Sequence, residues 1–241
     1  PGATLAALAG THNPFGTGGQ PPLVVINGGT MNTANYQHMQ NIHLTGGLIQ
    51  PTSAGTQVDG VDFRNGPTVT SFASGTTSEI ASKMTLRNQG ANGGVTFDVA
   101  NGTAATDLLL SGQMVSSGVV IKNGAGLLEI TNNSNSYTGT TTVNDGVLKV
   151  SADNALGASG AGQGTTVNSP GAVELASGVN TAEPLFLNGA GSGLGALFLN
   201  DGGSATASGP IVIASDASIG ALDGSTLNLN GTIDKNGTTV T

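Results

Sequence analysis

The 241-residue chain contains no cysteine and no tryptophan, and it has few charged and few aromatic residues. The absence of cysteine excludes disulfides, thiol nucleophiles and cysteine-ligated zinc sites. Only 6 lysine and arginine residues stand against 14 aspartate and glutamate residues, which gives a net charge of −8. Nucleic acids and anionic membranes bind clusters of basic residues, so this composition argues against both as partners.

Long hydrophobic runs are also missing from the sequence. The longest apolar stretches, such as 22–26 and 108–110, have the length of a strand and fall far short of the roughly 18 residues of a membrane-spanning helix. Hydrophobic residues make up 37% of the chain and charged residues 8%. Disordered chains combine low hydrophobicity with high net charge, so we expect this chain to fold.

Glycine, by contrast, is abundant, with 40 residues, and it recurs together with threonine, serine, asparagine and valine. These residues form helices poorly. Only residues 3–9 and, more weakly, 35–40 tolerate a helix. Elsewhere short apolar or β-branched segments alternate with turn dipeptides, as where 95–100 precede Asn101-Gly102. This alternation predicts an all-β protein.

The turn dipeptides recur at a regular interval. Asn-Gly and Asp-Gly begin at 101, 123 and 145 and again at 201 and 223, always 22 residues apart. An isolated dipeptide of this kind favours a two-residue hairpin, whereas a fixed period is typical of a repeat architecture. The period predicts a parallel β-helix, or β-solenoid, of about eleven coils with roughly 22 residues each.

Residues 119–157 carry the most specific pattern in the chain. It consists of a glycine pair after a lysine, an apolar segment, a Tyr-Thr-Gly turn, two further strands and a closing Ala-Leu-Gly. The segments in order are Lys122–Gly126, Leu127–Ile130, Tyr137–Val143, Val147–Val150 and Ala155–Gly157. The pattern resembles the autotransporter-associated β-strand repeat, also called the passenger-associated transport repeat. The resemblance implies a right-handed parallel β-helix from a secreted or surface-attached bacterial protein, without catalytic residues.

Three regions are expected along the chain. Residues 1–22 form an N-terminal segment that is irregular or contains a short helix, and 23–118 form less regular β-helix coils. Residues 119–241 form β-helix coils that include the recognised repeat at 119–157. The chain is expected to be a fragment of a longer repeat protein, with more coils after Thr241 or a second copy paired to that edge.

The alternation of side chains within the repeat predicts which of them are buried. Leu128, Ile130, Val143, Leu148 and Val150 are expected in the core, with their polar neighbours directed outward. We expect Tyr137 to cover the edge of a coil with its hydroxyl near the backbone. Gly139 is expected where a Cβ atom would not fit.

The densest charge cluster consists of Asp59, Asp62 and Arg64. A polysaccharide lyase built on a β-helix would hold calcium with such carboxylates and use the arginine as a base. The ordinary interpretation is that Asp59 belongs to an Asp-Gly turn. The histidines do not form a metal motif, because a five-residue gap places two of them on opposite faces of a strand; they are His12, His38 and His43.

Paired carboxylates, as in an inverting glycosidase, would have to converge from adjacent coils. The spacings of nine and eight residues between Asp98 and Asp107 and between Asp145 and Asp153 do not match one coil. Asp201 and Asp223 are one coil apart, but both precede glycine and resemble stacked turn residues. No catalytic, cofactor-binding or metal-ligating residue is therefore assigned, no cofactor is expected, and EDTA is expected to leave the stability unchanged.

These observations predict a non-catalytic, extracellular structural β-solenoid. It would serve as a stalk or passenger segment in adhesion, display, or fibre and surface assembly. The expected partners are further coils or copies of the chain end to end, surface glycans, or a host or neighbouring cell surface. The expected location is the bacterial cell surface, attached to the outer membrane, or the medium. The alternatives are a polysaccharide-active lyase or glycosidase and a glycan-binding module.

Overall fold

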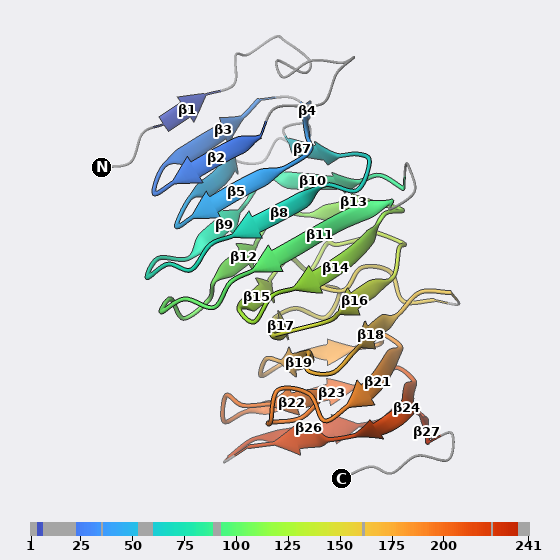
Figure 1. The fold of residues 1–241 in the computed structure, drawn as a ribbon. Helices are drawn as coiled ribbons and strands as arrows, with labels where there is room; N and C mark the ends of the chain where they lie inside the picture. Colours follow the sequence, from blue (N-terminus) through green and yellow to red (C-terminus); the bar gives the residue numbers. More distant parts are fainter. Residues whose placement is uncertain are drawn as a thin grey trace.

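The computed structural model describes residues 4–6, 23–34, 36–52, 60–88, 93–160, 162–222 and 224–235. Within these ranges every helix or strand assigned is a β-strand, and the strands pair in parallel from one coil to the next. The coils stack along one axis from the N-terminal to the C-terminal end (Figure 1). The predicted parallel β-solenoid is confirmed. Its right-handed winding stays a prediction.

Two sheets of ten strands each run the length of the stack. Sheet A contains, in order, β1 (Thr4–Ala6), β3 (Thr30–Thr33), β6 (Leu48–Pro51), β9 (Ser78–Ile80), β12 (Leu108–Leu110), β15 (Leu127–Ile130), β17 (Val147–Val150), β19 (Ala172–Leu175), β22 (Leu197–Leu199) and β25 (Ile219–Ala221). Sheet B contains β2 (Val24–Asn27), β5 (Ile42–Thr45), β8 (Thr68–Ser71), β11 (Gly94–Val99), β14 (Val119–Asn123), β16 (Thr141–Val143), β18 (Thr165–Val167), β21 (Leu185–Gly189), β24 (Ile211–Ala217) and β27 (Ile233–Asp234).

The third side of the solenoid is divided between two shorter sheets. Sheet C contains β4 (Tyr36–Met39), β7 (Gly60–Phe63), β10 (Lys83–Leu86) and β13 (Met114–Ser116). Sheet D contains β20 (Asn180–Thr181), β23 (Ser204–Ala207) and β26 (Thr226–Leu229). Between them, residues 131–140 and 151–164 close their coils as turns and loops instead of strands.

The coils are fewer and less uniform than the sequence predicts. Each long sheet has ten strands in place of the expected eleven. One coil advances 18 residues from Val24 to its partner Ile42, whereas another advances 28 residues from Thr68 to Thr96. The predicted helices are also wrong where they can be checked, because Thr4–Ala6 and Tyr36–Met39 are strands. Pairing with a neighbouring coil outweighs the weak local helix propensity in both segments.

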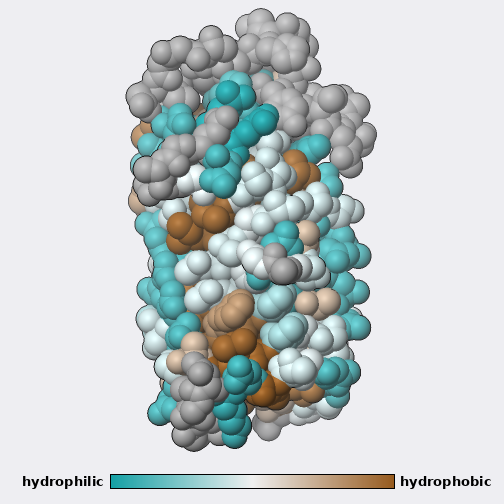
Figure 2. Space-filling view, turned by 90° about the vertical axis from the view of Figure 1, so that its right-hand side faces the viewer, coloured by the Kyte–Doolittle hydropathy of each residue, from teal (hydrophilic) through white to brown (hydrophobic). Residues whose placement is uncertain are grey.

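The core is a single cluster of aliphatic side chains enclosed by the sheets. Leu148 of β17 lies in register between Leu128 of β15 and Val173 of β19, and all three are fully buried. The predicted core is confirmed for all five residues: Leu128, Ile130, Val143, Leu148 and Val150. The surface in Figure 2 is accordingly polar or neutral over most of its area, with a few brown hydrophobic patches.

The turn that contains Tyr137 and Gly139 differs from the prediction in one respect. Tyr137 is fully buried, and its hydroxyl lies 2.7 Å from Thr141 Oγ1 instead of bonding to the backbone. Gly139 behaves as predicted, because a Cβ atom there would collide with the carbonyl group of Gly118 on the preceding coil. The glycine is thus required by close approach of two coils.

Candidate functional site

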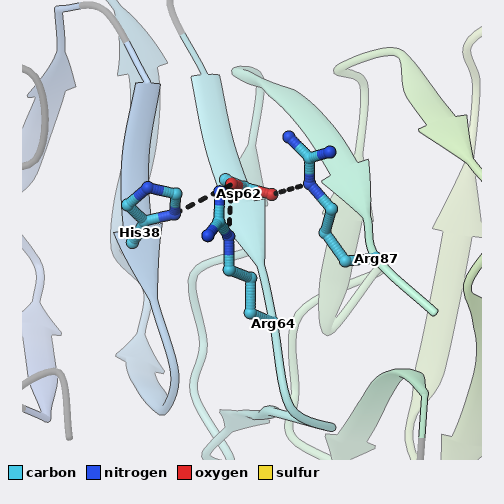
Figure 3. Close-up of polar contacts among 4 residues, drawn as sticks. All are labelled: His38, Asp62, Arg64 and Arg87. Carbon is cyan, nitrogen blue, oxygen red and sulfur yellow. Dashed lines mark hydrogen bonds and ion pairs between the residues drawn. The ribbon is translucent and has the colours of Figure 1, made fainter. Parts of the chain in front are cut away.

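Sheet C positions a charged cluster around Asp62, a residue of β7 (Figure 3). Its neighbour in register on β4 is His38, and its neighbour on β10 is Thr85. Arg64 follows β7, and Arg87 follows β10. The side chain of Asp62 is completely buried, and the three basic side chains reach it from three successive coils.

Each oxygen of Asp62 contacts a guanidinium group. Arg64 donates from Nε to Asp62 Oδ2 at 2.8 Å, and its Nη2 lies at 2.8 Å from the same atom. Arg87 donates from Nε to Asp62 Oδ1 at 2.8 Å. His38 Nδ1 lies 2.8 Å from Asp62 Oδ2, a close contact without the alignment of a hydrogen bond. The sequence grouped Asp62 with Arg64, whereas His38 and Arg87 join them only through the stacking of coils.

The cluster carries a net positive charge in an acidic protein. Burial lowers the pKa of His38, the Asp62 carboxylate opposes this shift, and Arg64 and Arg87 add to it. At neutral pH the histidine is therefore uncharged, and two guanidinium groups face one carboxylate. Because both oxygens of Asp62 are engaged by arginine, this residue offers no ligand to calcium, contrary to the lyase interpretation. A buried carboxylate paired in this way chiefly fixes the arrangement of its neighbours.

The remaining candidates from the sequence do not converge on one place. His43 lies on β5 of sheet B, where its ring meets Phe72 edge-on at 5.1 Å, while His38 lies on sheet C. Asp107 accepts hydrogen bonds from the backbone of Gly102 and Leu127, both at 2.8 Å, and so fixes a corner of the coil. Three candidates lie outside the described residues, namely His12, Asp59 and Asp223.

Two other carboxylates of the sequence pairs also bond to backbone. Asp145 Oδ1 accepts from Gly146 N at 2.7 Å, within its own turn. Asp201 Oδ2 accepts from Ser177 N at 2.6 Å, on the preceding coil. Both contacts agree with the interpretation of these residues as turn residues.

A buried carboxylate that sequence reasoning missed lies on the next coils. Glu183 is 3% exposed, and its Oε1 accepts a hydrogen bond from Thr165 Oγ1 at 2.9 Å. Its other oxygen, Oε2, is buried without a hydrogen-bond partner. Burial raises the pKa of Glu183 to about 7, and the bond from Thr165 opposes the shift. Its position directly before Pro184 gives no sequence signal for burial.

The pattern recognised at 119–157 builds two complete steps of both long sheets. β14 pairs with β16 in sheet B, and β15 pairs with β17 in sheet A. Residues 120–150 match the family model described as the passenger-associated-transport-repeat. The chain contains this repeat. No curated protein and no solved structure matches the chain significantly.

Within the passenger-associated transport repeat, Lys122 is the most unusual side chain because it is fully buried. Its Nζ donates to the carbonyl oxygens of Asn123 at 3.0 Å, Gly124 at 2.5 Å and Asp145 at 3.0 Å. Burial lowers the pKa of Lys122 to about 8, and nearby carboxylates, led by Asp145, oppose this shift. The ammonium group therefore remains charged at neutral pH and joins the corners of two successive coils.

The part of the chain that the structure describes has no helix of the length and apolarity needed to cross a lipid bilayer. The exposed large apolar side chains of those residues are few and are distributed over several coils: Leu23, Val25, Phe72, Leu194 and Ile233.

Proposed function

We propose that this chain is a structural, non-catalytic segment of the passenger of an exported bacterial protein, and that it forms a stiff rod outside the cell. The observation that carries the proposal is the position of the passenger-associated transport repeat, residues 120–150, inside the stack of coils. Such a repeat in the interior of a continuous solenoid serves as a building unit of the rod.

The repeat is joined to the coils on both of its sides. β14 pairs with β11 on the N-terminal side, and β17 pairs with β19 on the C-terminal side. The buried side chains of the repeat belong to the same core cluster as those of the flanking coils. Each coil of a solenoid is stabilised mainly by its neighbours, so the repeat and its flanks support each other as one rod.

The polar groups of the repeat also support a structural role. Lys122 donates to three backbone carbonyl oxygens, and Lys149 pairs with Glu174 at 3.1 Å on the next coil. These contacts join successive coils. We propose that the rod presents its loops to a surface glycan or to a neighbouring cell.

Export and display can be tested with the chain fused to a signal peptide and an outer-membrane translocator in a laboratory bacterium. We expect antibody labelling of intact cells and a protease-resistant core at the cell surface. Gly139→Ala, which disturbs the repeat, should reduce surface labelling, whereas Gly75→Ala should not, since a Cβ atom at Gly75 meets only Thr103 Oγ1 at 3.3 Å. Retention of a folded chain inside the cell would contradict the proposed location. Release of products from polyuronates in proportion to purified protein would contradict the non-catalytic role.

A further inference from the structure

A polar cavity of about 70 Å³ lies where the loop after β17 meets the segment around β20. Its polar lining comes from two successive coils, with Asp153, Asn154 and Ser159 on one and Asn180, Thr181 and Glu183 on the next. A cavity of this volume has room for an ion and several water molecules, and it is too small for a sugar ring together with its hydroxyl groups.

Two carboxylates belong to this lining, and no lysine, arginine or histidine of the described chain does. Asp153 is anchored by its Oδ1, which accepts a hydrogen bond from Asn180 N at 2.7 Å. Glu183 is almost completely buried, with Oε1 bonded to Thr165 and Oε2 without a partner. A buried carboxylate oxygen without a partner is energetically costly, and a cation beside it would remove that cost.

We propose that this cavity binds a calcium ion through the carboxylates of Asp153 and Glu183. The remaining ligands would be side-chain and carbonyl oxygens of the lining and water. Calcium accepts six to eight oxygen ligands in irregular geometry, whereas magnesium requires a nearly ideal octahedron. The lining supplies hard oxygen donors on two loop segments of unequal length, which suits calcium.

The proposal concerns a site with only two carboxylates. Within the described ranges no group of three or more histidine, aspartate or glutamate side chains is placed to hold a metal. Sites of this kind bind calcium weakly, with dissociation constants on the order of 10⁻⁴ to 10⁻³ M, as in extracellular modules. The sequence predicted no effect of EDTA because Asp153 and Glu183 are far apart in the chain, and the stacking of coils brings them to one cavity.

Terbium, which replaces calcium at oxygen sites and emits light when a nearby tyrosine is excited, gives a direct test. The chain has no tryptophan and only two tyrosines. Tyr137 lies against the cavity, since a Cβ atom on its lining residue Gly157 would be 2.8 Å from Tyr137 Cδ1. We expect sensitised terbium emission that millimolar calcium suppresses. Tyr137→Phe should abolish most of this emission yet keep the rise in melting temperature with calcium.

Three variants separate this site from nonspecific binding to an acidic protein. Calcium should raise the melting temperature of the wild-type chain and of Asp98→Asn, an exposed carboxylate elsewhere on the rod. Glu183→Gln should abolish the rise, and Asp153→Asn should weaken terbium binding at least about tenfold, a loss of at least about 1.4 kcal/mol.

Asp153 is exposed, so its variant keeps the test decisive even if Glu183→Gln fails to fold. Equal terbium binding by wild type and Asp153→Asn would overturn the proposal. The absence of both terbium emission and a calcium-dependent melting temperature in the wild-type chain would also overturn it.

Discussion

Asn144 Nδ2 donates a 2.9 Å hydrogen bond to Asn123 Oδ1 on the preceding coil. The same contact recurs on the following coils, where Asn168 donates to Asn144 at 2.9 Å and Asn188 donates to Asn168 at 3.3 Å. Four asparagines at corresponding corners therefore form a ladder of side-chain amides parallel to the axis of the rod. Such a ladder fixes the register of adjacent coils, because a slip of one residue would leave each amide without its partner.

Replacing the central member of this ladder should destabilise the rod. Asn144→Ala removes one donated and one accepted hydrogen bond, and each contributes about 0.5–1.5 kcal/mol. We expect the free energy of unfolding to fall by about 1–3 kcal/mol in urea titrations. The matched control is Asn101→Ala at an exposed turn, which should change the stability by less than about 0.5 kcal/mol. Equal effects of the two variants would show that the ladder contributes nothing to stability.

The core of the repeat should not tolerate a charge. Leu148 is fully buried between two leucine and valine neighbours of adjacent coils. Leu148→Asp should unfold the local coils or prevent expression, because an unpaired buried carboxylate costs several kcal/mol. Leu148→Ala should lower stability by about 2–5 kcal/mol. A melting temperature of Leu148→Asp within a degree or two of wild type would contradict the assigned core.

Close approach of two coils makes Gly139 sensitive to the smallest side chain. Its missing Cβ atom would collide with backbone atoms of Gly118 and Val119, which cannot rotate away. We expect Gly139→Ala to lower the melting temperature by several degrees, corresponding to about 1–3 kcal/mol of overpacking. Gly75→Ala is the control, and a comparable loss in both variants would argue against the close approach.

The buried carboxylate of Glu183 should make stability depend on pH in buffer that contains EDTA. The pKa of Glu183 is about 7 in the folded chain and about 4.5 in the unfolded chain, so the folded state holds the proton more tightly. The protonated side chain therefore favours folding fully below pH 4.5, and this contribution is lost as the pH rises to 7. The loss is on the order of 3 kcal/mol.

Glu183→Gln should remove that slope, because glutamine does not titrate. Urea titrations at several values between pH 4.5 and 7.5 measure the difference between the wild-type chain and the variant. The variant is expected to be the more stable of the two at pH 7.5, and parallel pH profiles would contradict the assigned burial.

The fold class could be predicted because it depends on local signals. Alternating apolar side chains, as at 147–150, and turn dipeptides at a fixed interval determine strands and corners without knowledge of the neighbouring coil. The buried positions of the repeat followed from the same alternation. The number of coils could not be predicted, because segments such as 100–107 and 151–164 lengthen single coils without changing the local pattern.

The charged sites could not be predicted because they depend on which residues the coils bring together. Arg87 meets Asp62 across 25 residues, and Thr165 meets Glu183 across 18. Neither interval equals the period of 22 read from the turns, so a fixed period would place these residues apart. The burial of Tyr137 likewise depends on the loop 151–164 of the next coil, where Gly157 lies against its ring.

Deletion of one whole coil tests most directly whether the repeat is an interchangeable unit of a structural rod. Val120 pairs with Thr141 in sheet B, so removing residues 120–140 takes out one step of the stack, while removing 131–140 takes out part of a step. We expect the first variant to keep its β-sheet circular dichroism and cooperative unfolding, and to be shorter by about one 4.8 Å layer in solution scattering. The second variant should lose stability or unfold. A folded 131–140 deletion beside an unfolded 120–140 deletion would contradict the account.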